Sequence, residues 1–269
     1  SPEVIVGLNA GADNNAIFVG SGCVFTNLNG VTIGDAGDGN TLTISNGHMY
    51  AKSTCRVGES GDDNTATVKA GGDWQIPGHL WIGEDAGADG NTVTVTGSGS
   101  TLNVSSYELE VGTYGSTNLL AIEDGGSVIA ARDTYIGKNA GATNNTLRIE
   151  GGSFQCTRAT PHGITYVRNG STFAVHGTNG TINLRQIQVL TSSTLDFRVD
   201  ADGVTPIVCS QDAEFDNTTK LNIDAEGLQS AGGGTVTLMT FSNKNQDIQV
   251  ITTQPAGCAV TQNATSITV

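Results

Sequence analysis

Six segments of this chain repeat at intervals of 24 to 27 residues, and this period restricts the fold more than any other feature of the sequence. Each segment has an asparagine, then alternating apolar residues, then a glycine turn, as in NTLTISNG and NTVTVTGSG. The anchoring asparagines, which we expect to form a structural ladder, are Asn15, Asn40, Asn64, Asn91, Asn118 and Asn145. A repeat of this length is typical of solenoids, whose units pack only against their neighbours.

Three short stretches in each repeat carry apolar residues at every second position, which is the period of a strand with one buried face. One precedes a glycine, as at Val57-Gly58, one follows the asparagine, as at Leu42 and Ile44, and one follows the glycine turn. For the last of these we expect an inner column of Val24, Met49, Trp74, Leu102, Val128 and Phe154. The sequence therefore predicts an all-β fold, a three-sided, right-handed parallel β-helix.

The repeat is clear in six coils and weakens beyond Phe154. The segment ITYVRNGSTFAVHG fits a degenerate seventh coil, in which Arg168 replaces the glycine. We therefore expect β-helix repeats over 1–189. Residues 190–269 are expected to form a β-rich C-terminal cap or irregular last coils continuous with the solenoid, because a solenoid needs a different end to cover its core.

The five cysteines lack the spacing of a zinc site. Cys209 and Cys258 both lie in the C-terminal region, where one interpretation is a disulfide formed in an oxidising compartment. The other is a pair of unpaired buried thiols.

Acidic residues outnumber basic ones by 26 to 12, so the field of the protein repels phosphate backbones. No stretch is long and apolar enough to span a bilayer. We expect neither nucleic acid as a partner nor membrane insertion.

The phrasing IGxxAGxxNTLTVxGG, with TLDFRVDADGVTPIV and LNIDAEGL, resembles the passenger regions of bacterial autotransporters and related surface repeat proteins. The resemblance covers nearly the whole chain, but its motifs encode coils and turns. It implies a secreted or cell-surface protein with an adhesive, structural or display role. The chain departs from true autotransporters in lacking the C-terminal membrane barrel, which implies a detached passenger, a chain anchored by other means, or an independent extracellular component.

Four outward residues of the strand before the glycine form the candidate ligand-binding stripe: Arg56, Trp81, Glu110 and Tyr135. Their aromatic rings and charges suit the stacking and hydrogen bonding of sugars, although the rings also serve simply to cover the sheet. The stripe holds a single acid, and the four histidines occupy unlike positions in their coils. We therefore expect a carbohydrate-binding or carbohydrate-active β-helix only as the alternative, and assign no catalytic residues.

Two residues before the asparagine, four coils carry an acid: Asp13, Asp38, Asp62 and Asp89. Aspartates in turns hydrogen-bond to backbone amides without a metal, which we favour, and Ca²⁺ between stacked carboxylates is the other interpretation. No other cofactor is expected.

Three consecutive coils carry outward threonine pairs: Thr41/Thr43, Thr65/Thr67 and Thr92/Thr94. Such a TxT array resembles those of ice-binding solenoids, although threonine also suits exposed strands through its β-branching. Ice binding is a minor alternative.

The first strand, Val4 to Val6, starts almost at once, with nothing before it to cover the first coil. An open β edge is a template for pairing with another chain. Three explanations of the open edge compete: a piece cut from a longer solenoid, a cap supplied by the C-terminal region of a neighbour, or end-to-end assembly into filaments. The expected function is a non-enzymatic extracellular structural or adhesive solenoid of a bacterial cell surface. Its expected partners are further copies of itself end to end, other surface proteins, or glycans.

Overall fold

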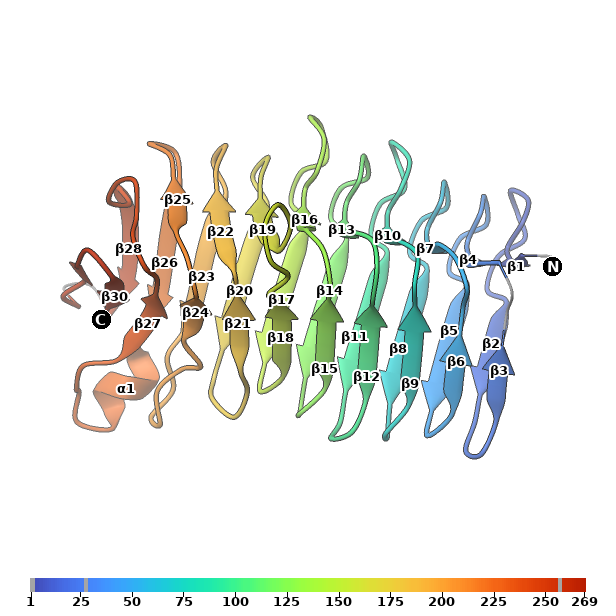
Figure 1. Cartoon of the computed structure of the whole chain (residues 1–269), viewed down its shortest axis with the longest axis horizontal. Coiled ribbons are helices and arrows are strands. Elements are labelled where there is room, and N and C mark those ends of the chain that lie inside the picture. Colours follow the sequence, from blue (N-terminus) through green and yellow to red (C-terminus); the bar gives the residue numbers. More distant parts are fainter. Residues whose placement is uncertain (1–2, 27–28, 256–257) are drawn as a thin grey trace.

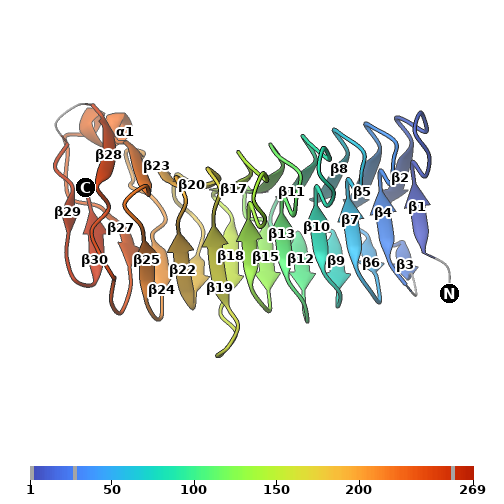
Figure 2. The ribbon, with the colours of Figure 1, turned by 90° about the horizontal axis from the view of Figure 1, so that it is seen from above.

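The computed structural model describes residues 3–26, 29–255 and 258–269. Over these residues the chain forms a rod of stacked coils, with the N-terminal coil at one end and the C-terminal strands at the other (Figures 1 and 2). Three sheets, here named A, B and C, run along the rod and enclose one apolar core. The predicted three-sided parallel β-helix is confirmed.

Sheet A contains the strand before the glycine of each repeat. Along the rod its strands are β1 (Val4–Val6), β4 (Val31–Ile33), β7 (Cys55–Val57), β10 (Leu80–Ile82), β13 (Leu109–Val111), β16 (Thr134–Ile136), β19 (Ile164–Val167), β22 (Gln186–Val189) and β25 (Ala213–Phe215).

Sheet B contains the strand after the asparagine. Its strands are β2 (Ala16–Val19), β5 (Thr41–Ser45), β8 (Thr65–Lys69), β11 (Thr92–Thr96), β14 (Leu119–Glu123), β17 (Thr146–Glu150), β20 (Thr172–His176), β23 (Thr194–Arg198), β26 (Lys220–Asp224) and β28 (Val250–Gln254).

Sheet C contains the third strand of each coil. Its strands are β3 (Val24–Thr26), β6 (His48–Tyr50), β9 (Asp73–Ile76), β12 (Thr101–Val104), β15 (Ser127–Ala130), β18 (Ser153–Cys156), β21 (Ile182–Leu184), β24 (Ile207–Cys209), β27 (Thr237–Thr240), β30 (Ser266–Thr268) and β29 (Thr261–Gln262). The last two pair antiparallel, and the short helix α1 (Glu226–Ser230) lies at the same end of the rod (Figure 1).

Equivalent residues of successive coils stack directly above one another. Leu42, Ala66 and Val93 are register partners, and all three are buried. One predicted core residue is wrong: Val24 lies opposite His48 and is 63 % exposed, whereas Phe25 lies opposite Met49. The number of residues between the sheet B and sheet C strands differs from coil to coil. The alternation of one coil therefore does not fix which residue of the next coil points inward.

The six asparagines lie in one column, which hydrogen bonds connect along the axis. The side-chain Oδ1 of Asn40, for example, accepts the backbone N–H of Asn15 at 2.9 Å, and Asn64 and Asn91 repeat this bond for the preceding coil. The ladder continues to Asn145. Each bond satisfies a backbone donor at the start of a sheet B strand. From Asn40 onward that donor is buried, and an unpaired N–H would destabilise the fold.

The glycine that follows a sheet A strand makes room for the asparagine of the next coil, from Gly7 with Asn40 to Gly112 with Asn145. Gly58 has a φ of +74°, and a Cβ there would lie 2.2 Å from Cγ of Asn91. Gly34 stands in the same relation to Asn64, and Gly112 to Asn145. The glycine and asparagine signals of the repeat are therefore two halves of one contact between coils.

The solenoid continues past residue 189 without a break. Parallel pairing of sheet B runs on through β23, β26 and β28. In these coils Ser171, Ser193 and Thr219 occupy the asparagine column, as the backbone bonds beside them show. The degenerate seventh coil is thus followed by further coils, and residues 190–224 extend the solenoid.

Cys209 and Cys258 are free thiols in this structure, which differs from the disulfide considered from the sequence. Cys209 is buried on β24, whereas Cys258 lines a cavity of about 270 Å³ beside α1. Burial raises the pKa of Cys209 to about 12, and that of the buried Cys55 thiol also to about 12. Such thiols stay protonated and react slowly with oxidants and disulfides.

We expect a thiol reagent such as Ellman's reagent to modify only Cys23 and Cys258 in the native protein, because the other three cysteines are buried. All five should react after denaturation without reductant. Three reactive thiols in the denatured protein would instead reveal a disulfide.

Candidate functional site

The outward residues of sheet A form one column along the rod. The predicted stripe residues are register partners in adjacent coils: Arg56 opposite Trp81, Trp81 opposite Glu110, and Glu110 opposite Tyr135. Tyr166 on β19 continues the column. We use the name polar-aromatic face for the column of Arg56, Trp81, Glu110, Tyr135 and Tyr166, together with the charged residues and histidines that flank it.

Arg56 is held by acids from three coils. Its Nε lies 2.5 Å from Oε2 of Glu84, and its Nη1 lies 3.3 Å from Oε1 of Glu3. Glu59 approaches Nε to 3.5 Å. The guanidinium also covers the Trp81 ring, 4.9 Å from its centroid. The charge of Arg56 is therefore compensated within the protein.

The aromatic rings of the face are covered by neighbouring groups. His79 stacks on Trp81 with a centroid separation of 5.0 Å, and Tyr135 stacks on Tyr166 at 4.7 Å. Arg168 lies 4.2 Å from the Tyr166 centroid. Burial raises the pKa of Tyr135 to about 12. The rings thus stabilise the sheet by stacking along the axis, and little of their faces is left for a sugar ring.

Glu110 differs from the surface position expected of it, because its side chain is only 1 % exposed. Lys138 contacts its Oε1 at 2.7 Å, and the Thr113 hydroxyl donates a hydrogen bond to its Oε2 at 2.8 Å. These two partners make burial of the carboxylate tolerable.

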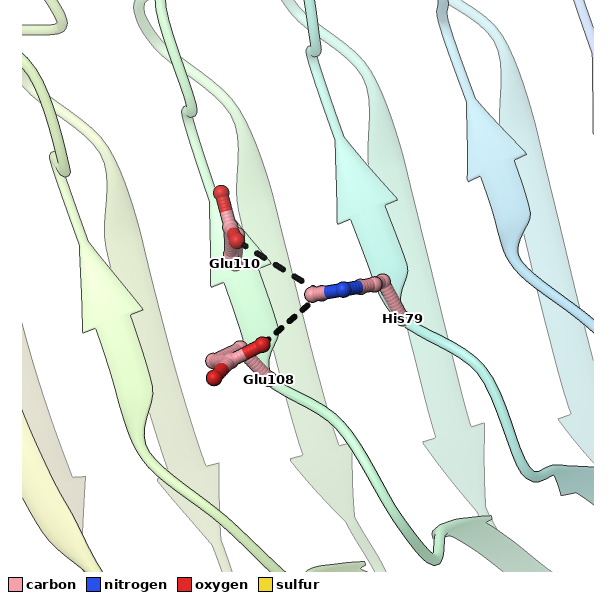
Figure 3. Close-up of side chains that lie close together, drawn as sticks. All are labelled: His79, Glu108 and Glu110. Carbon is pink, nitrogen blue, oxygen red and sulfur yellow. Dashed lines mark ion pairs between the residues drawn. The ribbon is translucent and has the colours of Figure 1, made fainter. Parts of the chain in front are cut away.

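His79 and Glu108 complete a cluster with Glu110 that the sequence analysis missed (Figure 3). Nδ1 of His79 lies 3.0 Å from Oε2 of Glu108 and 3.8 Å from Oε1 of Glu110. Burial lowers the pKa of His79, and the two carboxylates oppose that shift. Within the described ranges, no other His, Cys, Asp or Glu group brings three potential metal ligands this close.

The signal for this cluster was present one residue before the strands considered. Leu80 and Leu109 are register partners on neighbouring strands. His79 directly precedes Leu80, and Glu108 directly precedes Leu109. Residues two apart on a strand share a face, so Glu108 and Glu110 point to the same side. The four histidines occupy unlike positions in their coils, as expected, but one of them, His79, lies close to Glu108 and Glu110.

The predicted metal column of aspartates forms a chain of carboxylate to amide hydrogen bonds. Oδ1 of Asp13, Asp38 and Asp62 each accepts the backbone N–H of the next aspartate in the column, at 2.8 to 2.9 Å. Asp89 accepts the N–H of Ser116 at 2.6 Å. Each carboxylate therefore accepts a backbone N–H from the next coil, whereas the turn bonds expected were local ones.

The threonine pairs stack in register over three coils of sheet B, as Thr41, Thr65 and Thr92 illustrate. Phe18, which is 68 % exposed, lies opposite Thr43 at one end of the array. Ala121 lies opposite Thr94 at the other end. The array is thus limited to three coils, and no ligand is assigned to it.

A scan of protein-family models, a search of curated proteins and a search of solved structures found no match to this chain. In the part of the chain that the structure describes, no helix has the length and apolar character needed to cross a membrane.

Proposed function

We propose that this chain is a non-catalytic extracellular β-solenoid, similar to autotransporter passengers, that serves as a structural or adhesive component of a bacterial surface. The observation that carries the proposal is the ladder that connects the coils: asparagine, aspartate and backbone bonds join neighbouring coils from Asn15 onward. Such a rod transmits force through many parallel bonds and needs no ligand for its integrity.

The side chains of the polar-aromatic face support a structural role. Arg56 is paired with Glu84, and Glu110 is paired with Lys138. The rings of Trp81 and Tyr135 are covered by His79 and Tyr166. A group whose partner is already present contributes less to binding a ligand, because the existing contact must first be lost. The contacts of this face therefore favour a structural role over carbohydrate binding.

The N-terminal end of the rod favours association with a second copy. Within the described ranges, β1, β2 and β3 each have a neighbouring strand on one side only. Val24 on β3 and Phe18 on β2 are 63 % and 68 % exposed. Unpaired edges with exposed apolar residues pair readily with other chains. At the opposite end of the described chain β25 and β28 also have a neighbouring strand on one side only, but sheet C closes there with antiparallel strands. We therefore propose that rods join through their N-terminal ends.

Negative-stain electron microscopy of the purified chain tests this proposal. We expect rods joined at one end, with a joined fraction that rises with protein concentration. Charges on an edge strand block pairing, so the double variant Phe18→Lys, Val24→Lys should give single rods. Val208→Lys, a 40 % exposed residue on the interior strand β24, is the matched control and should still join. Single rods of the unmodified chain at every concentration would refute the association.

A further inference from the structure

The cluster of His79, Glu108 and Glu110 has the composition of a metal site. One potential ligand atom from each residue lies within 4.8 Å of the other two. The three side chains come from adjacent coils, His79 before β10 and the two acids at β13, and they converge on one point of the polar-aromatic face (Figure 3). None of these residues has a part in the ladder that carries the proposed function.

A second observation points to a ligand at this place. Nδ1 of His79 is buried and forms no hydrogen bond, although it lies 3.0 Å from a carboxylate oxygen. Buried polar atoms without a partner are rare, because they lose hydration and gain nothing in return. A cation between the imidazole nitrogen and the two carboxylates would satisfy all three atoms.

The ligands are held in position by their surroundings. The His79 ring stacks on the Trp81 ring at 5.0 Å and contacts the tilted Tyr107 ring at 4.8 Å. The Thr113 hydroxyl fixes Oε2 of Glu110, which leaves Oε1 on the side of the histidine. Ligands fixed by neighbouring groups lose little conformational entropy on binding, so such a site needs no large rearrangement.

We propose that His79, Glu108 and Glu110 form a binding site for Zn²⁺. A set of one imidazole and two carboxylates suits zinc, whereas Ca²⁺ and Mg²⁺ prefer oxygen ligands alone. Zinc takes such ligands at about 2.0–2.2 Å in tetrahedral geometry, which separates them by about 3.5 Å. The distances from Nδ1 of His79 to the two carboxylates, 3.0 and 3.8 Å, lie on either side of this separation. Small side-chain shifts therefore achieve it, and the fourth position is left for water.

Lys138 opposes metal binding and offers a test in the opposite direction. Its ammonium lies 2.7 Å from Oε1 of Glu110, the oxygen that faces His79, and 4.8 Å from the Tyr135 ring centroid. A positive charge this close repels a cation at the same carboxylate. Replacing Lys138 by methionine keeps the contact with the ring and removes the charge, so it should raise the affinity for zinc.

Isothermal titration of the metal-free chain with zinc chloride tests the proposal. We expect one zinc per chain in the unmodified protein, at least a tenfold loss of affinity in His79→Phe and in Glu108→Gln, and at least a tenfold gain in Lys138→Met. Phenylalanine keeps the ring stacking of His79, and glutamine keeps the size of Glu108, so both variants should remain folded, as circular dichroism will verify.

The matched control is His162→Phe. His162 is a half-buried histidine of the same face, with one acid, Asp133, at 3.5 Å instead of two. Its replacement should leave zinc affinity unchanged. No binding by the unmodified chain, or binding that survives both His79→Phe and Glu108→Gln, would overturn the site, and neither result would affect the association of rods.

Discussion

Replacing Gly58 by alanine is expected to lower the free energy of unfolding by about 2–5 kcal/mol. The left-handed backbone costs an L-residue roughly 1–2 kcal/mol, and overpacking a buried contact costs about 1–3 kcal/mol more. The contact is specific, because the new Cβ would lie 2.2 Å from Cγ of Asn91. Thermal unfolding followed by circular dichroism should show a melting temperature lower by roughly 10 °C, at 2–4 °C per kcal/mol for a chain of this size.

Gly170→Ala separates the two contributions. Gly170 has a φ of +72°, close to the +74° of Gly58, but a Cβ there would meet nothing within 4 Å. This control should therefore show only the backbone cost, roughly 1–2 kcal/mol. Equal losses in the two variants would mean that the contact between Gly58 and Asn91 does not restrict the fold.

Replacing Asn91 by alanine is expected to cost about 2–6 kcal/mol. Oδ1 of Asn91 accepts two hydrogen bonds from the preceding coil, from the backbone N–H of Asn64 at 2.9 Å and from its Nδ2 at 3.1 Å. Both donors are buried and would lose their acceptor, at about 1–3 kcal/mol each. Urea denaturation of the variant and the unmodified chain measures this difference.

Asn15→Ala is the control for Asn91→Ala, because Asn15 is the exposed first member of the ladder, where its side chain only donates. It should cost less than about 1 kcal/mol. The double variant Gly58→Ala, Asn91→Ala should lose less stability than the sum of the single variants, since the shorter side chain makes room for the new methyl group. Strict additivity would contradict the contact.

The six coils that the sequence predicted clearly are those that keep both the glycine and the asparagine, and the seventh was predicted only as degenerate. Beyond Gly137 the glycine position holds Arg168, and the asparagine position holds Ser171. The apolar alternation persists there, so parallel pairing continues. Serine and threonine fill the column with a smaller polar group, as Thr219 does by donating to the carbonyl of Val189 at 2.5 Å. The glycine and asparagine motif is therefore lost in these coils, although a small polar side chain still fills the asparagine column.

The candidate site was predicted only in part for a related reason. Alternation along β7, β10, β13 and β16 placed Arg56, Trp81, Glu110 and Tyr135 on one outer stripe, and the register agrees. The contacts of Glu110 come from residues outside the strands, namely Lys138 and Thr113. Its burial therefore could not be deduced from its position on the strand.

The sequence by itself determined the period, the three strands per coil and most members of each column, because stacking a repeated unit along one axis places equivalent residues above one another. Only the tertiary structure decided which side chains meet between columns. The contact of Gly58 with Asn91 and the approach of His79 to Glu108 and Glu110 link different coils. Such contacts depend on turn lengths, rotamers and the register between coils, which a one-dimensional pattern does not specify.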